Sequence, residues 1–171
     1  MPTSASTPPD SAQIATPRAR RQAAGDVGIV SEPRTVDVEA GFLQFFAKAT
    51  GETDPVYFDE AAARAAGHPA IPVPPTYFFS LHMSRPAKRG DIFDAENGVG
   101  VDKMKILHGE QSFIYHALAY AGDRLTITTT TEDIYAKKGG ALEFVIQTTR
   151  FEKDDGTLCA EAHQLAVVRN G

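Results

Sequence analysis

The chain has 171 residues, of which 42% are hydrophobic, and a formal net charge of −5 at pH 7. This length accommodates one ordinary domain, and ten phenylalanines can fill a real core. The acidic, interspersed charge argues against a nucleic-acid or anionic-membrane surface. A single cysteine, Cys159, excludes an internal disulfide framework, and its apolar surroundings predict a buried structural thiol.

The N-terminal segment, residues 1–25, is rich in Pro, Ser and Ala, which predicts a disordered leader before one domain over residues 26–171. The segment lacks the apolar core of a secretory signal, and no run approaches the roughly 20 apolar residues of a membrane span. We therefore expect a cytoplasmic protein.

The first half of the domain predicts helices. A short strand at "RTVDV" precedes "EAGFLQFFAKATG", in which Phe42, Phe45, Phe46 and Ala49 recur at helical spacing before a terminating Gly51. This spacing predicts a helix that ends at Gly51.

A turn, "GETDPVYFDE", follows this helix. Its Asp-Pro pair disfavours helix, and Asp59 then caps a short helix that ends at Gly67. After the extended "HPAIPVPP", Thr76 caps the apolar helix "TYFFSLHMS", which we expect to be buried. A long loop is predicted over residues 84–103.

From residue 104 onward the pattern has a period of two. Four runs rich in β-branched and aromatic residues are separated by the turns "AYAGD", "KKGG" and "DDG", which predicts an antiparallel meander. Strands segregated from helices indicate an α+β domain with the apolar helix laid on one face of the sheet.

This order resembles the hot dog fold. The stretches "FAKATGETDPVYFDEAAARAAGHPAIPVPPTYFF" and "YHALAYAGDRLTITTTTEDIYAKKGGALEFVIQTTRFEKDDGTLCAEAHQLAVV" resemble MaoC-like dehydratases, the family of R-specific enoyl-CoA hydratases. The resemblance covers roughly residues 30–169. Its nearest branch is the dehydratase domain that forms the N-terminal half of double hot dog proteins and also occurs as a separate subunit.

The resemblance implies a catalytic motif, Gly-Asp-x-Asn-Pro-(Ile/Leu/Val)-His, whose Asp and His hold the water that adds to an enoyl thioester. Here Pro55 and Val56 match, but Glu52 stands for the Asp, Asp54 for the Asn and Tyr57 for the His. A phenol with a reference pKa near 10 cannot exchange protons at neutral pH as an imidazole does. The sequence therefore keeps the turn residues of the motif but lacks its catalytic Asp and His.

Asp54 and Tyr57 each have two interpretations. Asp54 either faces a substrate channel or accepts hydrogen bonds from nearby backbone N–H groups in an Asx turn. Tyr57 either donates a hydrogen bond in a pocket or packs in a core or dimer interface.

Other candidate residues lie outside the motif. The resemblance implies that the Thr76 N–H polarises the thioester carbonyl, with Pro75 and Tyr77 beside it in the substrate site. His108 and Glu110, at i and i+2 of one strand, are predicted to share a face. That pair either supplies acid/base function and substrate contact or is a polar pair at a surface or interface.

The resemblance implies a hydratase/dehydratase acting on a CoA or acyl-carrier-protein thioester. We expect no cofactor beyond the substrate's own CoA or phosphopantetheine, and no metal, because no histidines have ligand spacing. We expect a homodimer, or a heterodimer in which a second MaoC-like subunit carries the intact motif. The alternatives are a hot dog thioesterase and a non-catalytic acyl-CoA-binding or interaction module.

Overall fold

A computed structural model of the chain describes residues 25–84 and 88–170. The predicted leader therefore lies almost entirely outside the described residues. No helix in the described ranges is long and apolar enough to cross a membrane.

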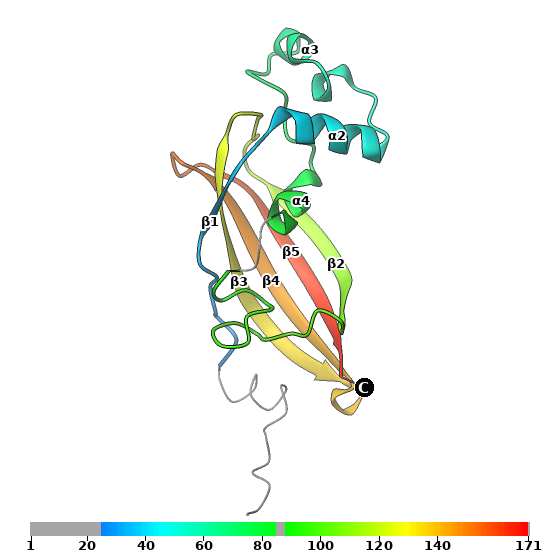
Figure 1. Ribbon diagram of the computed structural model, residues 1–171, viewed down its shortest axis with the longest axis vertical. Coiled ribbons are helices and arrows are strands. Elements are labelled where there is room, and N and C mark those ends of the chain that lie inside the picture. The colour runs from blue at the N-terminus through cyan, green and yellow to red at the C-terminus, as the bar shows by residue number, and fades with distance from the viewer. Residues whose placement is uncertain (1–24, 85–87, 171) are drawn as a thin grey trace, which may run out of the picture.

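The core of the fold is a five-stranded antiparallel sheet with the strand order β1-β3-β4-β5-β2 (Figure 1). All of its strands were expected from the period-two pattern or from "RTVDV", and together with the helices they confirm an α+β architecture. The strands are β1 (Arg34–Asp37), β2 (Ile106–Tyr115), β3 (Arg124–Lys137), β4 (Leu142–Lys153) and β5 (Leu158–Arg169).

The predicted meander is correct for β3, β4 and β5 and wrong for β2, which pairs with β5 rather than with the next strand in the chain. The connection between β2 and β3 runs past the end of the sheet. On the way, the Val73 N–H donates to the Ala119 carbonyl, and the Gly122 N–H donates to Val38. The chain thus crosses from β2 at one edge of the sheet to β3 near the opposite edge, and β2 remains an edge strand.

Helix α2 (Ala40–Thr50) forms as predicted and ends at Gly51, whose φ of 76° suits a residue without a side chain. The regular spacing of the phenylalanines does not mark the covered side of the helix. Leu43 and Ala47 are buried, whereas Phe42 and Phe45 are 57% and 71% exposed. The helix lies beyond the end of the sheet, so only the narrow stripe that faces the rest of the domain is covered (Figure 1).

Helix α3 (Glu60–Ala65) is capped by Asp59, whose Oδ1 accepts from the Ala62 N–H at 2.7 Å, as predicted. Helix α4 (Tyr77–Met83) lies across one face of the sheet (Figure 1). Thr76 occupies its N-cap position, as predicted, although its side chain makes no capping hydrogen bond.

Two hydrophobic clusters cover the inner face of the sheet. The first packs α4, through Phe78 and Leu81, against Phe151 and its neighbours. The second lies at the other end, where the loop that follows α4 places Val99 and Val101 on Val145 and Val168. Between the clusters, the inner face carries buried polar side chains: Thr129, Thr131, Gln147 and Thr149. Cys159 is a buried free thiol, as predicted.

Candidate functional site

The loop that carries the altered motif is held by its own carboxylates. Glu52 Oε1 accepts from the N–H groups of Thr53 and Asp54, at 2.7 and 3.1 Å. Asp54 Oδ1 accepts from the Val56 N–H at 3.1 Å and opens a 3-10 turn, η1 (Pro55–Tyr57). The Asx-turn interpretation of Asp54 is confirmed. Both acids therefore use oxygen atoms to stabilise the turn in which they lie.

Tyr57 closes this turn and is half-buried. Burial, followed by the negative charges of Glu52 and Asp54, raises the pKa of its phenol above the ordinary value. The phenol stays protonated at neutral pH, so it can donate a hydrogen bond but cannot accept a proton from water as imidazole does.

The start of α4 presents available backbone donors. The Tyr77 N–H donates to the Pro74 carbonyl at 2.9 Å, whereas the Thr76 N–H has no hydrogen-bond partner among the described residues. Tyr77 is buried, with its ring edge-on to Phe46 at 5.0 Å between centroids. Of the predicted substrate-binding residues here, Thr76 and Pro75 are exposed and Tyr77 is part of the core.

An apolar groove of about 380 Å³ lies next to the start of α4. Pro75 forms part of its wall, while Glu52, Asp54 and Tyr57 do not line it. The residues that line it are Val73, Pro75, Phe78, Tyr115, His116, Ala117, Leu118 and Ala119.

His108 and Glu110 do not share a face, so the predicted same-face pair is wrong. A β-bulge at Gly109 shifts the register, so that His108 lies opposite Ala166 and Glu110 opposite Leu165. Ala166 and Leu165 are consecutive and point to opposite faces, so the two β2 side chains do as well. His108 contacts Phe79 on the inner face, at 4.9 Å between ring centroids. Both His108 and Glu110 are exposed.

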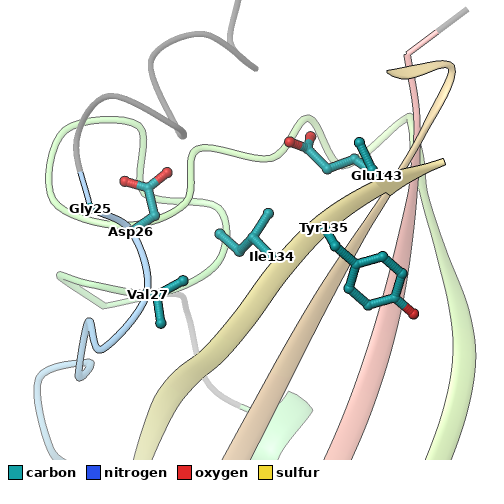
Figure 2. Close-up of a pocket in the computed structure, with 7 residues that line it drawn as sticks. Gly25, Asp26, Val27, Ile134, Tyr135 and Glu143 are labelled. Atoms are coloured by element: carbon teal, nitrogen blue, oxygen red, sulfur yellow. The ribbon is translucent and has the colours of Figure 1, made fainter. Parts of the chain in front are cut away.

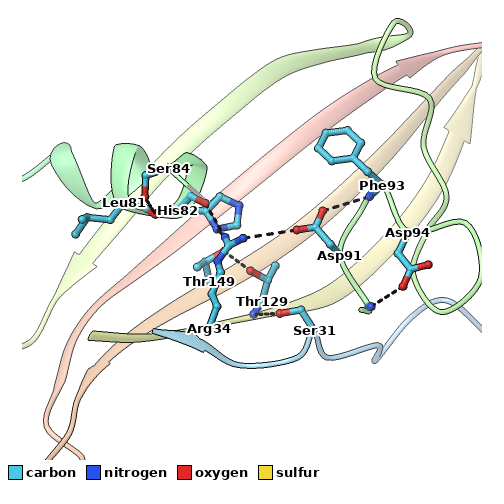
Figure 3. Close-up of polar contacts among 11 residues, drawn as sticks. Ser31, Arg34, Leu81, His82, Ser84, Asp91, Phe93, Asp94, Thr129 and Thr149 are labelled. Carbon is cyan, nitrogen blue, oxygen red and sulfur yellow. Dashed lines mark hydrogen bonds and ion pairs between the residues drawn. The ribbon is translucent and has the colours of Figure 1, made fainter. Parts of the chain in front are cut away.

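The sequence analysis missed a buried polar network at the other end of α4 (Figure 3). Arg34, on β1, is 8% exposed, and its Nη2 donates to His82 Nδ1 at 2.6 Å and to the His82 carbonyl at 2.7 Å. Its Nη1 lies 3.9 Å from Asp91 Oδ2. Burial, and then the charge of Arg34, lowers the pKa of His82 to about 4. His82 is therefore neutral at pH 7.

One signal in the sequence points to this network. Arg34 and Val36 alternate with exposed residues along β1, so Arg34 occupies an inward position, where an arginine needs a partner. His82 lies four residues after Phe78, on the covered side of the helix.

Figure 2 shows a smaller cavity, of about 230 Å³, at the far end of β3 and β4. Asp26 and Glu143 border it, and both are buried and have interaction partners. Among residues 25–84 and 88–170, no group of three or more His, Cys, Asp or Glu residues could hold a metal ion.

Comparisons with known proteins agree with this architecture. Residues 25–162 match the family model described as "FAS1-like, dehydratase domain region". A UPF0336 protein of Streptomyces coelicolor is 38% identical over 111 residues, which are 64% of this chain and 71% of that protein.

Two solved structures have a similar fold. A chain of the HadBC (3R-hydroxyacyl-ACP dehydratase) complex from Mycobacterium tuberculosis has a TM-score of 0.69 at 24% identity, covering 83% of this chain and 96% of that one. A chain of the ChsH1-ChsH2 complex from the same organism has a TM-score of 0.67 at 25% identity, covering 90% and 94%. The hot dog prediction is confirmed, and the chain belongs to the family described as the FAS1-like dehydratase domain region.

Proposed function

We propose that this chain is the substrate-binding subunit of an acyl-thioester hydratase/dehydratase, which interconverts trans-enoyl and (R)-3-hydroxyacyl thioesters. The observation that carries the proposal is the altered loop. It keeps the turn of the family motif, but Glu52 and Asp54 accept from their own backbone and Tyr57 has a raised pKa. Hydration needs a base and a proton donor at one carbon-carbon bond, and this loop supplies no such pair.

The groove beside α4 supports a role in substrate binding. The thioester carbonyl would accept from the Thr76 N–H, and the acyl chain would lie on apolar side chains such as Phe78 and Leu118. The chain would need no cofactor of its own, since the substrate carries CoA or phosphopantetheine.

The missing acid/base pair would come from a second MaoC-like subunit with an intact motif. The two Mycobacterium tuberculosis neighbours are from complexes with two named components, HadBC and ChsH1-ChsH2. Edge strand β2 exposes Ile114 and Tyr115, each about half accessible, and α2 exposes two phenylalanines. A partner strand added to β2 would extend the sheet and cover apolar surface of this kind.

The test compares crotonyl-CoA hydration by the chain alone with hydration by its complex with a MaoC-like subunit that has the intact motif. We expect no turnover by the chain alone and turnover by the complex. In the complex, Thr76→Pro removes the backbone donor, and we expect kcat to fall about 100-fold or more. Thr76→Ala keeps the N–H and should leave kcat nearly unchanged.

Three outcomes would overturn the proposal. Hydration by the chain alone, lost on changing Glu52 or His108, would make it a catalytic subunit. Release of free thiol would indicate a thioesterase. Thermal stabilisation by acyl-CoA, with no turnover alone or in the complex, would indicate a non-catalytic binding module.

A further inference from the structure

A second cavity lies at the C-terminal end of α4, away from Thr76, and nothing above assigns a role to it. Its volume is about 310 Å³, which is within the range of small-molecule sites. Helix α4 contributes Phe79, His82 and Met83, and the loop after α4 contributes Ile92 and Phe93. Strands β2, β4 and β5 complete it with Ile106, Leu107, His108, Gln147 and Gln164.

The protonation state of His82 follows from its contact with Arg34 (Figure 3). A guanidinium group has only donors, so Nδ1 of His82 must be the acceptor in the 2.6 Å contact. The single proton of the neutral ring is then on Nε2. Arg34 thereby holds both the tautomer and the position of the ring, since it also binds the His82 carbonyl.

Several polar groups in the cavity, among them the His108 imidazole, have unused hydrogen-bonding capacity. His82 Nε2–H has no partner among the described residues, and the same is true of the Gln164 side-chain amide. Gln147, beside Gln164 across the strand pair, donates to Thr131. The remaining lining is mainly aliphatic and aromatic. A few oriented polar groups in an apolar cavity are typical of a site that orients a small ligand.

The charges favour a neutral ligand. The guanidinium of Arg34 is engaged by His82 and lies 3.9 Å from Asp91. Lys103, the other cation of the lining, is exposed and sits over the Phe93 ring at 5.1 Å. A carboxylate entering the cavity would lose hydration without gaining an unpaired buried cation.

We propose that this cavity binds an apolar ligand that carries a neutral, hydrogen-bond-accepting oxygen, such as an aliphatic ketone or alcohol, with His82 Nε2–H as the donor. The ligand is either a free molecule or the oxygenated tail of a thioester that binds at Thr76. Six residue steps along α4 separate Thr76 from His82, which is about 9 Å along the helix axis.

The experiment uses the full chain labelled with 15N and observes the imidazole nitrogens by NMR. The probe is 2-octanone, and its control is 2-methyl-1-octene, which has the same shape with CH2 in place of the oxygen. We expect the ketone to bind about tenfold more tightly, the ratio that one hydrogen bond provides, and to shift the His82 Nε2 signal. Octanoate should bind more weakly than the ketone.

Two variants and one control variant test the assignment. His82→Asn keeps an acceptor toward Arg34 but removes the Nε2 donor, so the tenfold preference for the ketone should disappear while alkene affinity is retained. Gln164→Leu should reduce the preference, and His68→Asn, outside the cavity, should leave it intact. Equal affinity for ketone and alkene in the wild type, tighter binding of octanoate, or an unchanged preference in His82→Asn would overturn the proposal.

A second arm distinguishes the sources of the ligand. If the ligand is a thioester tail, 9-oxodecanoyl-CoA but not decanoyl-CoA shifts the His82 signal, and Thr76→Pro abolishes that shift. The 2-octanone signal does not depend on Thr76. These measurements require neither turnover nor a partner subunit. The cavity proposal can therefore fail while the proposed function stands, and the proposed function can fail while the cavity proposal stands.

Discussion

At the scale of single residues, the acids of the motif loop accept hydrogen bonds from backbone N–H groups only a few positions away in the chain. The Asx turn at Asp54 and the cap at Asp59 were predictable because both are local patterns. The contact between Arg34 and His82 joins residues 48 positions apart. Local spacing carries no information about such a contact, so only the inward position of Arg34 hinted at it.

The half-buried His82 makes stability depend on pH. Its pKa is about 4 in the folded protein and near 6.5 when unfolded, so between these values the unfolded state binds more protons. The contribution of His82 to the free energy of unfolding is therefore fully present above pH 6.5. It is lost as the pH decreases toward 4, by up to about 3 kcal/mol.

Urea unfolding at pH 7, 5.5 and 4.5 measures this loss. His82→Asn cannot titrate, so its free energy of unfolding should change less over the same interval than that of the wild type. Parallel pH profiles for the two proteins would contradict the assignment.

At the scale of elements, the bulge in β2 decides which side chains reach the inner face. The period-two pattern correctly predicted the strand but could not reveal an extra residue, so Glu110 was placed on the wrong side. Likewise, the spacing of Phe42 and Phe45 predicted a helix correctly but not which side of it is covered. Burial depends on where the helix sits relative to the sheet.

Gly109 allows this bulge, because a Cβ there would lie 2.7 Å from Leu165 Cδ2 and 2.9 Å from the Leu165 carbonyl oxygen. We expect Gly109→Ala to lower the free energy of unfolding by about 1–3 kcal/mol, as overpacking does. Chemical denaturation measures the change.

Gly41→Ala is the matched control, since a Cβ at Gly41 in α2 meets nothing within 4 Å. That variant should be unchanged or more stable by up to about 1 kcal/mol. Equal effects at the two positions would show that crowding by Leu165 is not the cause.

At the scale of the whole molecule, the order of elements and the resemblance of two long stretches were sufficient to predict the hot dog fold. The strand order was not predictable, because pairing of β2 with β5 is a contact between distant segments that the connection past the sheet end makes possible. The groove beside Thr76 and the cavity at His82 also depend on how α4 lies on the sheet.

The proposed partner would pair with edge strand β2. Ile114→Lys puts a charge on this edge, which natural proteins use to prevent strand addition. We expect the variant to remain folded and to lose the complex with the second subunit, measured by light scattering after size-exclusion chromatography.

Val30→Lys adds the same charge at a site 58% exposed and distant in the strand order, beside β3. It should leave the complex intact. Loss of the complex in both variants, or in neither, would place the interface elsewhere.

The bulge at Gly109 has a further consequence for assembly. It interrupts the regular backbone ladder of β2, so a docking strand can stay in register along Glu110–Tyr115 but must carry a compensating irregularity to continue past it. A strand with the wrong length or without that irregularity would fit only part of the edge. The position of one glycine would thus discriminate between partners whose side chains are otherwise equally acceptable.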